Sequence, residues 1–155
     1  MLSGEKLNNP KVPTDADRAK VHAMIKEHKP DMLYLDAHHR ACTDWDVSRI
    51  VKAAQELGVP VMMRIDHADQ APMISSLLDL GLFSIKVPTV EDEETVQRII
   101  DGFYYPPFGK RSLDGSNNWG EDIAKAEGVP YWKWWNENAI LGMKLETVKG
   151  VLLAR

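Results

Sequence analysis

The order of apolar segments along the chain constrains its fold more than any other feature. Short apolar runs, typical of buried strands, alternate with segments whose apolar residues recur at i, i+3, i+4 and i+7, which is typical of helices. The four strand-like runs cover residues 32–35, 59–65, 82–87 and 140–145. Strands that alternate with helices through short connections predict parallel βα units, and therefore an α/β fold. The longer interval at residues 102–139 is predicted to be a loop with one short helix.

Residues that cap helices divide the chain further. Thr14, Thr43 and Thr147 each precede a helical pattern, so we expect them to cap helix N-termini, and Gly58 is expected to end the second helix. Residues 1–13 contain two asparagines and two prolines and no recognisable strand, which predicts a loose N-terminal lead-in.

Composition excludes several classes of function. The chain has 155 residues, of which 44% are hydrophobic and 27% charged, as expected for one globular domain. The formal charge of −4 disfavours nucleic acid and anionic membranes as partners. No apolar run approaches the length of a membrane span or of a signal-peptide core, so we expect a cytoplasmic protein. A single cysteine, Cys42, excludes an intrachain disulfide.

Polar side chains gather where the predicted strands end. The first strand ends in Asp36-Ala37-His38-His39-Arg40, the second in Arg64-Ile65-Asp66-His67, the third in Lys86-Val87-Pro88 and the last in Lys144-Leu145-Glu146-Thr147. Active sites of parallel α/β folds lie at the carboxyl ends of the strands. The sequence therefore predicts that these residues meet at one rim.

Two kinds of chemistry suit such a rim. A carboxylate such as Glu146 can bind a hard divalent cation, a histidine can act as a base, and an arginine can stabilise an enolate. Together they suit carbon–carbon cleavage beside a carbonyl group. The alternative is a metal-dependent hydrolase built on Asp36, His38, His39, Asp66 and His67. Taken alone, Asp36 and Asp66 are about as consistent with helix capping as with a functional role.

Residues 34–147 resemble the HpcH/HpaI aldolases, the class II metal-dependent pyruvate aldolases that act on 4-hydroxy-2-oxo acids. The resemblance rests on a series of short motifs in a fixed order. They are Leu35-Asp36-Ala37-His38-His39, Val61-Met62-Met63-Arg64, Leu78-Asp79-Leu80-Gly81, Val87-Pro88, Tyr105-Pro106-Pro107-Phe108-Gly109-Lys110-Arg111-Ser112, Asn136 and Leu145-Glu146-Thr147.

The resemblance implies a β/α (TIM-type) barrel of the phosphoenolpyruvate/pyruvate superfamily over residues 14–155, with about four βα units legible. It implies a carbon–carbon lyase that cleaves its 2-oxo acid substrate reversibly to pyruvate and an aldehyde. The resemblance further implies that Mg²⁺, Mn²⁺ or Co²⁺ would stabilise the enolate, and the family usually assembles as a homohexamer.

The resemblance also assigns roles to individual residues. His39 corresponds to the base and Asp36 is its neighbour, while Arg64 corresponds to the enolate-stabilising arginine. Asp79 corresponds to the carboxylate that raises the basicity of the histidine, and Glu146 to the first metal ligand. Lys144 stands at a substrate-contact position, and Arg111 could hold a distal carboxylate of the substrate.

The chain departs from the family pattern in three ways. His38 stands where the family usually has Glu, and Lys144 where it usually has Gln. The family's second metal ligand, an Asp, lies on a strand beyond Arg155, and a full barrel needs about 250 residues. We therefore expect a truncated barrel. A third hypothesis is a catalytically inactive half-barrel that packs against a partner subunit.

Overall fold

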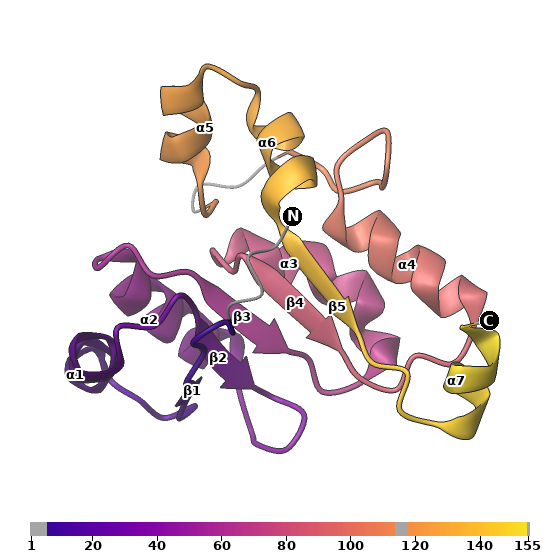
Figure 1. The fold of residues 1–155 in the computed structure, drawn as a ribbon, viewed down its shortest axis with the longest axis horizontal. Coiled ribbons are helices and arrows are strands. Elements are labelled where there is room, and N and C mark those ends of the chain that lie inside the picture. The colour runs from indigo at the N-terminus through magenta and orange to yellow at the C-terminus, as the bar shows by residue number, and fades with distance from the viewer. Residues whose placement is uncertain (1–5, 114–117, 155) are drawn as a thin grey trace.

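The computed structural model describes residues 6–113 and 118–154 and contains one parallel sheet (Figure 1). Five strands lie in sequence order, each hydrogen-bonded in parallel to the next. They are β1 (Lys11–Val12), β2 (Leu33–Asp36), β3 (Val61–Arg64), β4 (Ser84–Val87) and β5 (Ile140–Met143). The predicted parallel α/β architecture is therefore confirmed.

Helices connect the strands. They are α1 (Arg18–His28), α2 (Asp44–Gln55), the 3-10 helix η1 (Ala68–Met73), α3 (Ile74–Asp79), α4 (Glu93–Phe103), α5 (Glu121–Glu127), α6 (Tyr131–Asn138) and α7 (Val148–Leu153). Helices α5 and α6 project together beyond one end of the sheet in Figure 1, and α7 lies near α4. Within the described residues no helix is both long and apolar enough to span a membrane.

Alternation along the strands gives the sheet two unlike faces. Neighbouring strand residues point to opposite faces, and parallel register aligns equivalent positions. One face carries Leu33, Leu35, Met63 and Ile85, which pack into a single core with buried side chains of α1 to α4. The residues between them on the strands point to the other face, which is rich in charge. The apolar face fixes the register, because a slip of one residue would bury the charges.

Helix caps explain where several helices begin. Thr43 accepts a hydrogen bond from Asp46 N at 3.3 Å, and the Asp46 carboxylate accepts one from Thr43 N at 3.0 Å, so the predicted cap of α2 is a complete capping box. Thr147 caps α7, also as predicted. The prediction for Thr14 was wrong: α1 begins after Asp17, whose carboxylate accepts from Lys20 N at 2.8 Å.

Strand β1 and helix α6 are among the elements that were not predicted. Strand β1 is only two residues long and pairs through Lys11 with Tyr34. The described residues therefore contain five strands where four were expected, and one of them lies in the predicted lead-in. Helix α6 forms in the predicted long loop, and its Trp134 and Trp135 are buried. Trp135 Nε1 donates to the Phe103 carbonyl at 2.9 Å, so α6 is anchored by a polar contact as well as by packing.

Candidate functional site

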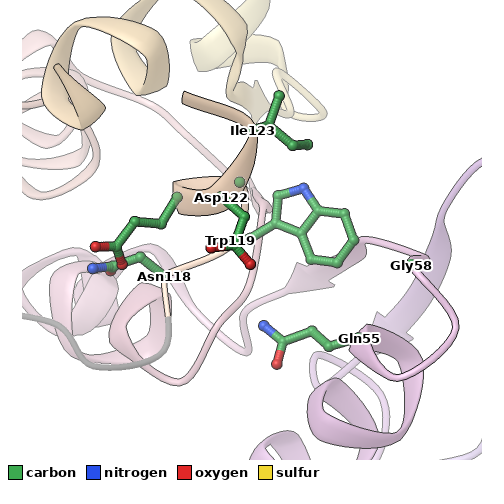
Figure 2. A pocket seen from close by; sticks show the side chains of 8 residues that line it. Gln55, Gly58, Asn118, Trp119, Asp122 and Ile123 are labelled. Carbon is green, nitrogen blue, oxygen red and sulfur yellow. The ribbon is translucent and has the colours of Figure 1, made fainter. Parts of the chain in front are cut away.

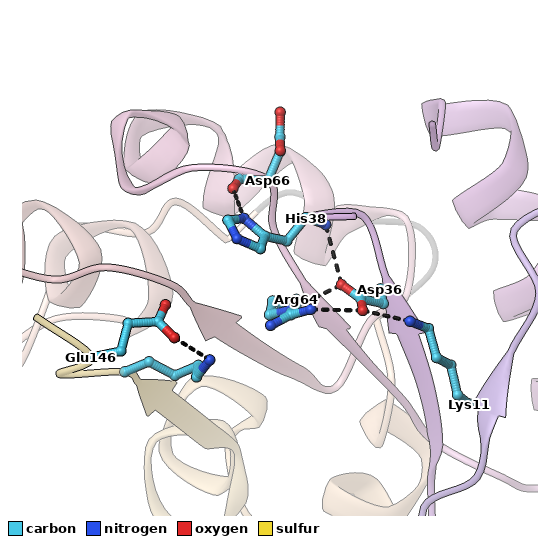
Figure 3. A network of polar contacts seen from close by, with 7 residues as sticks. Lys11, Asp36, His38, Arg64, Asp66 and Glu146 are labelled. Atoms are coloured by element: carbon cyan, nitrogen blue, oxygen red, sulfur yellow. Dashed lines mark hydrogen bonds and ion pairs between the residues drawn. The ribbon is translucent and has the colours of Figure 1, made fainter. Parts of the chain in front are cut away.

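Asp36 and Arg64 form the centre of the candidate site at the carboxyl ends of β2 and β3. They are register partners in the sheet, so their side chains leave the same face side by side. Arg64 donates from Nε to Asp36 Oδ1 at 2.8 Å and from Nη2 to Asp36 Oδ2 at 2.7 Å (Figure 3). This bidentate pairing leaves the Nη1 edge of the guanidinium directed away from Asp36.

Asp36 is held as a buried carboxylate. Its side chain is 3% exposed and also accepts hydrogen bonds from Lys11 Nζ at 2.6 Å and from His38 N at 3.2 Å. Burial by itself raises the pKa of Asp36. The hydrogen bonds and positive charges of Arg64 and Lys11 outweigh burial and hold that pKa well below its usual range. Asp36 therefore orients Arg64 and is not suited to act as a base near neutral pH.

Two histidines follow β2 directly. The Nδ1 of His38 is hydrogen-bonded to the Asp66 carbonyl oxygen (Figure 3), so Nδ1 carries the proton and Nε2 is the acceptor of the neutral ring. His39 is exposed, and its ring meets the His38 ring edge to face with centroids 4.3 Å apart. Both imidazoles thus lie at the same end of the sheet as Arg64.

Glu146 lies beyond the end of β5, and its carboxylate is occupied by donors of the chain itself. Oε1 accepts from Thr89 N at 3.1 Å and from Thr89 Oγ1 at 3.2 Å, while Oε2 forms an ion pair with Lys144 Nζ. The hydrogen bond from Lys144 is the main reason why the pKa of Glu146 is lowered. Figure 3 shows Arg64 and Glu146 on the same side of the sheet, with β4 between them.

These residues do not by themselves fit a divalent metal ion. Within residues 6–113 and 118–154, no group of three or more His, Cys, Asp or Glu side chains is placed to hold one. Glu146 is a suitable oxygen ligand, but it is paired with an ammonium group, and Asp36 is saturated by Arg64, Lys11 and His38. A metal would need both the displacement of Lys144 and further ligands.

The structure places Asp79 and Arg111 away from this rim. Asp79 ends α3, just before β4 begins, whereas His39 follows the end of β2, so the fold puts them at opposite ends of the strands. Arg111 is buried and donates from Nη2 to Asp79 Oδ1 at 2.9 Å. Its guanidinium lies 4.8 Å from the Tyr105 ring centroid and 4.6 Å from that of Trp135. Their predicted catalytic and substrate-binding roles receive no support from contacts within this chain.

The hydrolase alternative also lacks a site. His67 accepts a hydrogen bond from Asp69 N at 3.2 Å and so caps η1, and Asp66 is exposed. Both carboxylate oxygens of Asp36 accept hydrogen bonds from Arg64. The five residues of that hypothesis therefore lie near one another in the fold but do not converge as ligands in the described part of the chain.

A well-formed cavity of the described residues lies elsewhere. It has a volume of about 490 Å³ and lies between the end of α2 and the start of α5, with Gln55, Gly58 and Trp119 among its lining residues (Figure 2). Gly58 precedes β3, so this cavity is at the amino ends of the strands. It contains none of the predicted site residues, and we place the candidate site at the carboxyl ends on chemical grounds.

Three residues of the rim were given no role from the sequence. Lys11 reaches Asp36, Thr89 holds Glu146, and Lys86 stands between Arg64 and Gly142 in the sheet register with its Nζ 5.1 Å from the centre of the Tyr34 ring. The only available signal was the position of Lys86 and Thr89 near the end of a predicted strand. Lys11 had none, because β1 is too short to be recognised.

Comparisons with known proteins find similarity to aldolases. No family model matches the sequence. The chain is 28% identical over 87 residues to 2-keto-3-deoxy-L-rhamnonate aldolase of Escherichia coli O9:H4 (strain HS), a match that covers 56% of this chain and 32% of that protein. It is 27% identical over 109 residues to 2-dehydro-3,6-dideoxy-6-sulfogluconate aldolase of Pseudomonas putida, covering 70% of this chain and 40% of the relative. The chain thus spans less than half of the curated relatives.

The fold comparison covers nearly the whole chain. The crystal structure of an HpcH/HpaI aldolase from Desulfitobacterium hafniense DCB-2 superposes with a TM-score of 0.74 and 25% identity, over 99% of this chain and 58% of that one. The predicted resemblance to the HpcH/HpaI aldolases is therefore confirmed in sequence and in fold. The five parallel strands correspond to part of the β/α barrel of that class, and the fold class is confirmed as well.

Proposed function

We propose that this chain carries the site of a carbon–carbon lyase that cleaves 4-hydroxy-2-oxo acids to pyruvate and an aldehyde. The observation that carries the proposal is the Asp36–Arg64 pair, which holds a largely buried, oriented guanidinium at the rim where two histidines lie. The aldolase relatives and the shared fold support the same class of reaction.

The reaction divides between a base and an anion-stabilising group. A base removes the proton of the C4 hydroxyl, the C3–C4 bond breaks, and its electron pair becomes the enolate of pyruvate while the aldehyde leaves. Return of a proton to C3 gives pyruvate. We assign the base to His39 and enolate stabilisation to Arg64, with Asp36 as the residue that positions Arg64.

The metal and the assembly remain proposals from the resemblance alone. Glu146 would be the first ligand of Mg²⁺, Mn²⁺ or Co²⁺, which would supply Lewis-acid stabilisation of the enolate. Because Lys144 forms an ion pair with Glu146, no step of the proposed reaction is assigned to a metal. A homo-oligomer is likewise proposed, and size-exclusion chromatography with light scattering tests it.

Pyruvate release tests the proposal. The purified chain is incubated with a 4-hydroxy-2-oxo acid, and pyruvate is followed through lactate dehydrogenase and NADH absorbance. We expect His39→Ala to lower the rate about 10²–10⁴-fold, which is the usual contribution of a general base. His28→Ala is the matched control, because His28 is exposed on α1 and remote from the rim.

A third histidine variant separates the two rim imidazoles. The His38 ring is oriented by the Asp66 carbonyl oxygen. Loss of activity in His38→Ala but not in His39→Ala would identify His38 as the base, and the proposed lyase activity would still hold. No pyruvate from the wild-type chain with or without added Mg²⁺ or Mn²⁺ would favour the catalytically inactive half-barrel.

A further inference from the structure

The carboxylate of Glu146 already holds a cation of the chain itself. Lys144 Nζ pairs with Oε2, and Thr89 supplies two donors to Oε1 at 3.1 and 3.2 Å. All three donors come from segments adjoining β4 and β5. A divalent ion could bind Glu146 only by displacing an ammonium group whose charge repels it.

The backbone fixes Lys144 in this position. Lys144 N donates to the Val87 carbonyl at 2.9 Å, and the Lys144 carbonyl accepts from Val90 N at 3.0 Å, so the ladder between β4 and β5 continues on both sides of the residue. Thr147 then caps α7 and limits movement of the segment that carries Glu146. The fold therefore sets the backbone positions of both residues of the ion pair.

The charged face of the sheet carries an excess of positive charge. Lys11, Arg64 and Lys86 lie on the same face by register, and Lys144 follows β5. Two carboxylates, Asp36 and Glu146, oppose these four cations, which leaves two positive charges. A divalent cation would increase that excess, whereas an anion would reduce it.

We propose that Lys144, together with Arg64, binds the carboxylate of a 2-oxo acid in the place that a divalent metal ion would take. This inference rests on the proposed function and names how its site holds the substrate. An ammonium group has three N–H donors, of which Glu146 engages one, and the Arg64 Nη1 edge points away from Asp36. Glu146 acts here as the residue that positions the Lys144 ammonium.

Oxalate, a planar dianion that resembles the enolate of pyruvate, is the probe. Isothermal titration calorimetry in EDTA measures oxalate binding, and electron paramagnetic resonance measures Mn²⁺ binding. We expect wild-type protein to bind oxalate in EDTA and to bind Mn²⁺ poorly. Lys144→Gln should weaken oxalate binding at least 10-fold and strengthen Mn²⁺ binding. Adding Glu146→Gln to that variant should remove the gain in Mn²⁺ binding.

Two lysine variants serve as controls. Lys149→Gln removes an exposed charge on α7, 4.0 Å from Glu91. It should change the binding of neither oxalate nor Mn²⁺. Lys144→Arg keeps the charge, so it should retain oxalate binding and show no gain in Mn²⁺ binding. This variant separates loss of charge from misfolding. Circular dichroism verifies that each variant is folded.

The inference is overturned if wild-type protein binds oxalate only with Mn²⁺ present or not at all, or if Lys144→Gln leaves Mn²⁺ affinity unchanged. The pyruvate assay keeps the two proposals apart. Metal-dependent pyruvate release with tight Mn²⁺ binding overturns the lysine site and leaves the lyase. Metal-independent oxalate binding without pyruvate release supports the lysine site and overturns the lyase.

Discussion

Replacing Asp36 by Asn should destabilise the protein strongly, because it removes the counter-charge of a largely buried guanidinium. The Asp36 side chain is 3% exposed and that of Arg64 is 11% exposed, so water cannot replace the lost partner. Asn keeps one acceptor oxygen and nearly the same volume. The substitution therefore tests the charge of Asp36 with little change in packing.

The expected magnitude follows from burial. Removing one partner of a buried ion pair costs about 3–5 kcal/mol. The Lys11 contact adds little, since that side chain is 41% exposed and exposed pairs contribute about 0–1 kcal/mol. Because Asn retains one hydrogen bond, we expect a loss of about 3 kcal/mol in the free energy of unfolding. With a urea m-value of about 2 kcal/mol/M, the midpoint falls by about 1.5 M.

Urea denaturation followed by circular dichroism at pH 7 measures this loss. Asp101→Asn is the matched control, because Asp101 pairs at 2.7 Å with a lysine whose side chain is 79% exposed, and it should cost less than about 1 kcal/mol. A double-mutant cycle with Arg64→Gln isolates the Asp36–Arg64 coupling.

Acid should remove the difference between wild type and Asp36→Asn. The pKa of Asp36 is lower in the folded state than the usual value of about 3.9, so its stabilisation is complete above that value. It declines as the pH falls through the lower, folded-state pKa. An Asp36→Asn variant within 1 kcal/mol of wild type at pH 7, or a difference that declines between pH 8 and 6, would refute this reasoning.

Three further predictions concern other parts of the fold. Thr43→Ala removes the capping box of α2 and should cost about 1 kcal/mol in urea denaturation; an unchanged midpoint would show that the cap is not needed. Burial, followed by the charges of Asp46 and Asp44, raises the pKa of Cys42 to about 11, so thiolate absorbance at 240 nm should rise only above about pH 10, and a midpoint near 8.5 would contradict it. Gly58 and Gly120 both have positive φ, but a Cβ at Gly58 meets open space whereas one at Gly120 lies 2.2 Å from the Trp134 ring. Thermal unfolding should show Gly58→Ala losing about 1 kcal/mol and Gly120→Ala about 1–3 kcal/mol more, and equal losses would argue against the close contact.

Much of the fold could be predicted because its signals are local. The strands around Leu35, Met63 and Ile85 are short apolar runs, and Thr43 caps its helix through neighbours three residues away. Strand β1 could not be predicted, since its two residues form a strand only by pairing with β2. Helix α6 was missed because its aromatic residues carry no capping signal, and it is held by Trp135 against a distant carbonyl.

The sequence by itself determined which residues reach the rim. Polar side chains directly follow apolar strands, and parallel strands carry their carboxyl ends to one edge. Asp36, Arg64 and Glu146 were placed there on that basis alone. Only the tertiary structure decided their partners. Arg64 bonds Asp36 across 28 residues of sequence because parallel register aligns them.

The same distinction separates the remaining candidates. Asp79 meets Arg111 at the other end of the strands, and Lys144 neutralises Glu146 where the motif alone suggested a metal. Spacing along the chain shows which end of a strand a residue follows. Which charge lies against which depends on register and on the packing of distant segments, and these exist only in the folded chain.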